Sequence, residues 1–124
     1  MSSDYDDLFV DEEESRKRVM RIAEPYLRFT QDGEILYEDE YEILTGKQKV
    51  LLQIVAARIL HEQGLRDEEG IKAGEIAENI QKSKSSIEGY VYGSLKGIVE
   101  SSNGKLRVPN SALNKVHKEV NGDD

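Results

Sequence analysis

The segment TGKQKVLLQIVAARILHEQGL, residues 45–65, constrains the fold more than any other part of the chain. Thr45 is a favourable N-cap for a helix, and Gly64 is suited to end one. The apolar side chains between them cover far more than one helical stripe: Val50, Leu51, Leu52, Ile54, Val55, Ala56, Ala57, Ile59 and Leu60. A helix that is apolar on so many sides lies at the centre of a domain. We therefore expect the N-terminal part of the chain on one side of it and the C-terminal part on another.

The chain length and the residue types exclude several classes of protein. A chain of 124 residues can form one domain with a single core and a short extension. It has no cysteine, which rules out disulfides and thiolate metal sites. His61 and His117 lie far apart without ligand spacing, so we predict no metal site and no cofactor. No nucleophile motif or glycine-rich phosphate loop occurs, and we predict that the chain is not an enzyme.

Charge is distributed unevenly along the chain. The formal net charge is −8, which by itself argues against nucleic-acid binding. However, Met1 to Gly46 holds 14 acidic and 5 basic residues, whereas Lys72 to Lys118 holds 8 basic and 4 acidic residues. The chain has no apolar run long enough for a membrane span, and its first residues are acidic rather than basic as in a secretory signal. We expect a cytoplasmic protein without membrane contact, whose C-terminal half is compatible with nucleic acid.

The N-terminal third is predicted to be an extension of the core. Residues 1–11 are expected to form a flexible acidic tail, and residues 12–44 a helix and a β-hairpin packed on the core. Pro25 ends the helix, and Asp32-Gly33 is a favoured two-residue hairpin turn. The basic run of this helix is a candidate nucleic-acid arm or, as we prefer, a solvated face neutralised by glutamates four residues away, in the pairs Glu12–Arg16, Glu13–Lys17 and Glu14–Arg18.

The C-terminal part gives a definite order of signals. A short helix, GEIAENI, precedes a polar turn, QKS, and Ser83 then caps a second helix. That helix places Ile87, Val91, Leu95 and Ile98 on one face. After Ile98 the pattern changes to a period of two around the turn SSNG, which predicts a two-stranded ribbon. The expected fold class is mainly α with small β: a winged helix-turn-helix core of three helices and a two-stranded wing over residues 45–120, followed by a flexible tail at 121–124.

The stretch EIAENIQKSKSSIEGYVYGSLKGIVESSNGKLRV resembles the winged helix-turn-helix domains of bacterial and archaeal transcription regulators. The resemblance covers about residues 47–118. It implies a recognition helix at about 83–98 that enters the major groove, and a wing at about 99–109 that contacts the DNA backbone or the minor groove. Those roles fall on Ser83 through Lys96 and on Ser101 through Arg107.

The predicted recognition helix contains glycines four residues apart, at 89, 93 and 97. On a helical wheel, Gly89 and Gly93 face away from Ile87 and Val91 and form a bare ridge. The ridge can approach DNA closely, it can dock another helix, or the glycines are tolerated and Gly97 ends the helix. A Gly93→Leu change is expected to abolish either interaction without unfolding the domain. The predicted DNA-binding residues are Lys82, Lys84, Ser85, Ser86, Gly89, Tyr92, Gly93, Lys96, Lys105 and Arg107.

Two functions remain open at this level. The first is a regulator of transcription that binds double-stranded DNA, acting as a homodimer on a two-fold site. Its dimer contact would come from the N-terminal elements or from the helix SALNKVHKEV, whose stripe of Leu113, Val116 and Val120 can equally close the domain. The alternative is a non-enzymatic adaptor that binds a protein partner through the glycine face or the acidic N-terminal region.

Overall fold

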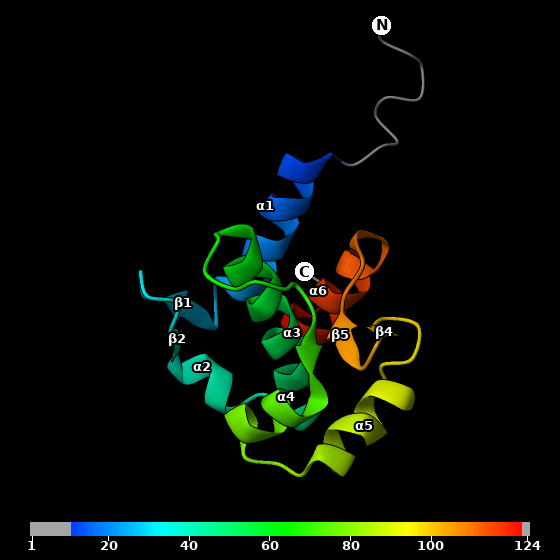
Figure 1. The fold of residues 1–124 in the computed structure, drawn as a ribbon. Coiled ribbons are helices and arrows are strands. Elements are labelled where there is room, and N and C mark those ends of the chain that lie inside the picture. Colours follow the sequence, from blue (N-terminus) through cyan, green and yellow to red (C-terminus); the bar gives the residue numbers. More distant parts are fainter. Residues whose placement is uncertain (1–10, 123–124) are drawn as a thin grey trace, which may run out of the picture.

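The computed structural model describes residues 11–122, which form six α-helices and two small antiparallel sheets (Figure 1). The elements in chain order are α1 (Glu12–Ala23), β1 (Leu27–Phe29), β2 (Ile35–Tyr37), α2 (Asp39–Glu42), α3 (Gly46–Glu62), β3 (Ile71–Lys72), α4 (Ala73–Ile80), α5 (Lys84–Tyr92), β4 (Glu100–Ser102), β5 (Lys105–Arg107), the 3-10 helix η2 (Asn110–Ala112) and α6 (Leu113–Asn121). The predicted class, mainly α with small β, agrees with this architecture.

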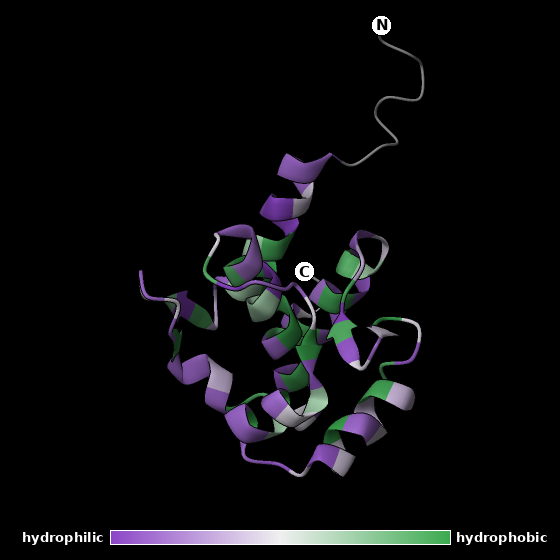
Figure 2. Ribbon diagram, in the orientation of Figure 1, coloured by the Kyte–Doolittle hydropathy of each residue, from purple (hydrophilic) through white to green (hydrophobic). Residues whose placement is uncertain are grey.

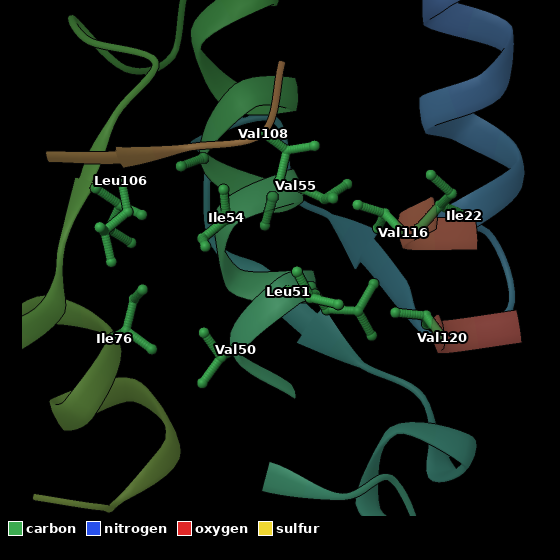
Figure 3. Packing of buried hydrophobic residues seen from close by; sticks show 14 of the residues in the cluster. Ile22, Val50, Leu51, Ile54, Val55, Ile76, Leu106, Val108, Val116 and Val120 are labelled. Atoms are coloured by element: carbon green, nitrogen blue, oxygen red, sulfur yellow. The ribbon is translucent and has the colours of Figure 1, made fainter. Parts of the chain in front are cut away.

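Helix α3 is the central element, as its composition predicted. Thr45 and Gln48 form a complete capping box, and Gly64 takes a left-handed conformation just beyond the helix end. Every residue from Val50 to Ala57 is buried. Figure 3 shows Ile22 of α1 with Val116 and Val120 of α6 on one side of α3, and Ile76 of α4 with Leu106 of β5 on another. Apolar residues concentrate on α3, whereas the first turns of α1 are hydrophilic (Figure 2).

Both ends of the described chain are more ordered than predicted. Residues 1–10 and 123–124 lie outside the described residues, but Asp11 caps α1 by accepting a hydrogen bond from the Glu14 amide at 2.8 Å. Asn121 is the last residue of α6, and its Nδ2 donates to the Ile22 carbonyl at 3.3 Å. The predicted tails, 1–11 and 121–124, were therefore one residue too long at each helix: Asp11 caps α1, and Asn121 belongs to α6. Composition did not show this, because contacts define a cap and a helix end.

The helices α1 and α6, far apart in the sequence, pack on each other and on α3. Helix α1 buries Ser15, Val19, Ile22 and Ala23. The stripe of α6 is buried as well, with Leu113, Val116 and Val120 at most 4% exposed. This stripe closes the core, which excludes it as a dimer contact. Two of the three predicted ion pairs of α1 form, but Arg16 pairs with Glu62 of α3, with 3.2 Å between Nε and Oε2, instead of Glu12.

The N-terminal hairpin forms as predicted, but its turn differs. Strands β1 and β2 pair Phe29 with Ile35, and the Thr30 amide donates to the Glu34 carbonyl at 3.0 Å. The loop thus holds three residues, 31–33, and not the two-residue Asp32-Gly33 turn. Gly33, with φ at 93°, supplies the left-handed residue that three-residue hairpin loops require. Helix α2, which was not predicted, follows the hairpin and buries Tyr41.

The second sheet has the strand order β3-β5-β4, with both pairings antiparallel. Its β4–β5 hairpin was predicted, and residues Asn103 and Gly104 form its two-residue turn with φ values of 53° and 77°. Strand β3 was missed because two residues are too few to show alternation. Leu106 of β5 pairs with Ile71 of β3, which attaches the hairpin to the segment that leads into α4.

Helix α5 is shorter than the predicted recognition helix at 83–98. It ends at Tyr92, with Gly93 as its C-cap, and residues 93–98 form turns. Gly97 has a φ of 89°, a left-handed conformation that favours glycine. Leu95 and Ile98 therefore do not lie on the helix, although Leu95 is fully buried. The predicted continuous ridge of glycines does not form. Gly89 lies on the helix, but Gly93 is its C-cap and Gly97 lies in the turn that follows.

Candidate nucleic-acid interface

Helix α5 is held in place by its cap and by one apolar face. Ser83 precedes the helix, and its Oγ accepts a hydrogen bond from the Ser86 amide at 3.1 Å. Ile87 is fully buried and Val91 is 3% exposed, so these two side chains fix the face that points inward. The opposite face is open to solvent over residues Ser85, Gly89 and Tyr92, and Tyr92 is 63% exposed. Lys84 precedes Ile87 by three residues but is also exposed, because it lies in the first turn.

The short turn before α5 brings further positive charge to this face. Helix α4 ends at Ile80, and Gln81 takes a left-handed conformation with φ at 58°, which reverses the chain within three residues. Lys82 lies in this turn, Lys84 in the first turn of α5, and Lys96 in the reversal after it. All three are exposed, and among residues 11–122 none of them has an ion-pair partner. These three cations can therefore meet an external anion.

The basic side chains of the β4–β5 hairpin are in a different situation. Lys105 is ion-paired and hydrogen-bonded to Glu68, and this contact lowers the pKa of the Glu68 carboxyl. Arg107 places Nε 3.3 Å from an oxygen of Glu69 and Nη1 3.5 Å from one of Glu100. The outward direction of both side chains was predicted, but their acidic partners were not. Lys105 and Arg107 already have their charge offset within the chain.

The predicted serine contacts are also partly occupied. The Oγ of Ser83 lies 2.8 Å from the Oγ of Ser86 and 3.2 Å from that of Ser85. Each hydroxyl keeps further donor or acceptor capacity, because a hydroxyl can donate once and accept twice. The exposed N-terminus of α5 thus combines hydroxyl groups, backbone amides and Lys84.

A groove of about 430 Å³ runs between α4, α5 and the β4–β5 hairpin. Lys72 and Lys84 line it, and so do three carboxylates, of Glu75, Glu78 and Glu88. The Glu75 carboxylate is paired with both terminal nitrogens of Arg66, at 3.0 and 3.2 Å. The groove therefore has mixed charge, with two lysines and three carboxylates in its lining.

The glycines of the predicted ridge have separate roles. A Cβ added at Gly89 would meet nothing within 4 Å, which agrees with an open outer face. A Cβ added at Gly93 would lie 2.7 Å from the backbone oxygen of Gly89, too close without a backbone shift. The expectation that Gly93→Leu leaves the fold intact was therefore wrong. Gly89 lies on the open surface, whereas Gly93 is required by the helix end.

Sequence reasoning missed a chain of hydrogen bonds that runs from the buried side chains of Gln53 and Tyr41 to exposed residues of β2 and α4. Nε2 of Gln53 donates to the hydroxyls of Tyr37 at 2.8 Å and Tyr41 at 3.2 Å, and Nδ2 of Asn79 donates to the Gln53 Oε1 at 2.8 Å. Burial raises the pKa of the Tyr41 hydroxyl to about 12. The only signal in the sequence was a glutamine within an otherwise apolar run, Val50 to Ala57. This chain of hydrogen bonds ties the N-terminal hairpin and α2 to the helix that precedes α5.

Other classes of site are not apparent in the described part of the chain. Within residues 11–122, no three histidine or acidic side chains gather as metal ligands would. His61 is exposed, with Nδ1 3.1 Å from the Arg66 carbonyl, and His117 is half-buried on α6. None of the helices in this range is both long and apolar enough to cross a bilayer.

Comparison with known proteins adds no relative. The chain matches no family model, no curated protein and no solved structure. The function is therefore argued from the geometry of α5 and its surroundings.

Proposed function

We propose that this chain is a transcriptional regulator that binds double-stranded DNA through a winged helix-turn-helix core. The order of elements supports the fold: α4 and α5 are joined by a three-residue turn, as in helix-turn-helix units, and an antiparallel hairpin follows. In this proposal α5 is the recognition helix and the β4–β5 hairpin is the wing. The resemblance of the segment from Glu75 to Val108 to regulators of this class points the same way.

The observation that carries the proposal is a set of three exposed lysines at the two ends of α5, none of which has an ion-pair partner within residues 11–122. Lys82, Lys84 and Lys96 flank a helix whose inner face is fixed by Ile87 and whose outer face is open at Gly89. Lysines neutralise phosphates and release counterions, which supplies most of the sequence-independent affinity for DNA. Ser85, Ser86 and Tyr92 lie on the same exposed face and provide hydrogen-bonding groups for phosphates or base edges.

The test is binding of the full chain to mixed-sequence duplex DNA at two salt concentrations. We expect affinity that falls steeply with salt, and a loss of roughly tenfold or more for the double variant Lys84→Glu/Lys96→Glu. The matched control is Arg21→Glu/Lys115→Glu, which changes the net charge equally but on α1 and α6. If the control weakens binding as much as the α5 variant, only the total charge matters and α5 is not the interface.

The mixed charge of the groove favours a second candidate, an adaptor that binds a protein. Glu78 and Glu88 face the same groove as Lys72 and Lys84, and a phosphate backbone would be repelled by the two acids. An adaptor would use the face around Gly89 without a strong dependence on salt. Absence of DNA binding at low salt, together with a stable protein complex that Gly89→Leu disrupts, would replace the first proposal by this one.

A further inference from the structure

Helix α1 borders a large groove. The groove has a volume of about 620 Å³ and lies between α1, β1 and the C-terminal end of α3. Its lining is mainly apolar, from Val19, Met20, Ala23, Leu27, Phe29 and Ile59. Met20 is 57% exposed, although it is itself part of this apolar lining. A flexible methionine at such a place is well suited to enter an apolar groove of a partner.

Charged residues along the groove stand in an order such that two copies of α1, placed antiparallel, would bring opposite charges together. Glu13, Lys17, Met20 and Glu24 follow each other at three- or four-residue spacing on one face of α1 and its cap, and Arg28 comes next on β1. Arg28 is held near the end of α1 by hydrogen bonds from Nη1 to the carbonyls of Glu24 and Leu27. The order along the chain is therefore negative, positive, methionine, negative, positive, and in the reverse direction every sign is exchanged.

This order selects a second copy of the chain as the partner. A two-fold axis beside Met20, with the two α1 helices antiparallel, places Lys17 of one copy opposite Glu24 of the other. The same axis places Glu13 opposite Arg28, so that every facing pair is attractive. A parallel arrangement would place each charge against its own copy and would be repulsive.

The rest of the structure is consistent with this surface. The other apolar stripe considered for a dimer contact, on α6, is buried in the core. The first turns of α1 extend beyond the body of the molecule, where a second copy can reach them (Figure 1). Arg16 and Glu62, which also line the groove, pair with each other at 3.2 Å. Lys17, at 53% side-chain exposure, has a longer contact of 4.0 Å with Glu13 one turn away.

We propose that the chain forms a two-fold symmetric dimer through antiparallel α1 helices, with Met20 of each copy inserted into the groove of the other. The inference does not depend on DNA binding, although such a dimer would present two α5 helices to a two-fold site. We expect one short helix and one groove per copy to bury less than the roughly 800 Å² per partner of a typical stable interface, so the dimer should dissociate on dilution.

The test is sedimentation velocity of the full chain over a wide range of concentration, without DNA. We expect a reversible monomer–dimer equilibrium that Met20→Glu shifts to monomer. Lys17→Glu and Glu24→Lys should each weaken association by roughly tenfold or more, because each leaves like charges facing across the axis. The double variant Lys17→Glu/Glu24→Lys should restore association, because it exchanges the two members of the facing pair.

The restoration is the decisive result. Residues 17 and 24 lie about two turns apart on the same helix and cannot pair within one chain, so a merely local effect would not be reversed. Arg21→Glu, an equal charge change on α1 outside the groove, should leave association unchanged. A wild-type chain that stays monomeric at the highest concentration, or a double variant no better than the singles, would overturn the proposal. Measuring low-salt DNA binding of Met20→Glu separately keeps this result distinct from the fate of the DNA proposal.

Discussion

Helix α5 and the β4–β5 hairpin both present basic side chains, but they hold them in opposite ways. The lysines around α5 have no acidic partners in the described residues, and the helix is held by buried apolar groups such as Ile87. The hairpin carries Lys105 and Arg107 with acidic partners from the loop before β3 and from β4. Strand β4 itself is exposed along its whole length. The sequence shows which element carries a cation, whereas the acidic residues beside it in the folded chain decide whether it can bind an external anion.

The largest expected effect is on the free energy of unfolding, when the buried side chain that holds α5 is removed. Ile87→Ala should destabilise the folded protein by about 2–5 kcal/mol, because it removes a fully buried side chain and leaves a cavity. Glu68→Gln, which breaks the exposed ion pair of Lys105, should have almost no effect on stability by comparison. Urea unfolding followed by circular dichroism measures both. Equal losses in the two variants would show that the hairpin is held by its ion pairs as firmly as α5 is held by its core.

The next prediction separates the two glycines of α5. Gly93→Ala should cost roughly 1–3 kcal/mol, since its Cβ would be forced against the Gly89 carbonyl oxygen. Gly89→Ala should instead stabilise the protein by about 0.5–1 kcal/mol, because alanine is the better helix former and its Cβ has free space. Thermal unfolding of the pair provides the measurement. A stable Gly93→Ala variant would mean that the helix continues past Tyr92.

The smallest expected effect tests the availability of the hairpin charges. The double variant Glu68→Gln/Glu69→Gln removes the two acids contributed by the loop before β3, so Lys105 and Arg107 become able to approach phosphates. We expect DNA affinity to rise by a few-fold at low salt, and the increase to disappear when Lys105→Gln is added. Asp39→Asn/Glu40→Gln, an equal charge change at exposed positions on α2, is the control. An equal rise in the control would assign the effect to net charge alone.

Much of the fold could be predicted from local patterns. Thr45, Ser83 and the apolar run of α3 predicted helix starts and the central helix because caps and periodicity act within a few residues. The hairpins followed from turn residues and alternation. Strand β3 and helix α2 could not be found in this way, because two and four residues are too few to show a period. Strand β3 forms by pairing with β5, which lies far along the chain. The end of α5 was missed for a related reason: Leu95 is apolar and at helical spacing, but it reaches the core from a turn.

In the candidate site, too, some features follow from local sequence patterns and others depend on contacts between distant segments. The sequence by itself determined which residue types stand at the start of α5, that Ile87 and Val91 face inward, and that Gly89 therefore faces outward, because helical spacing is a local property. Lys84 lies three residues before Ile87 on the same side of the helix, and only the structure shows that it is exposed at the first turn. Only the tertiary structure decided that Lys105 and Arg107 meet Glu68 and Glu69, and that Gln53 links Tyr41 to Asn79. Those partners are separated by about 12 to 38 residues in the chain, and electrostatic and hydrogen-bonding contacts act over a few ångströms, which only the folded chain can bring about.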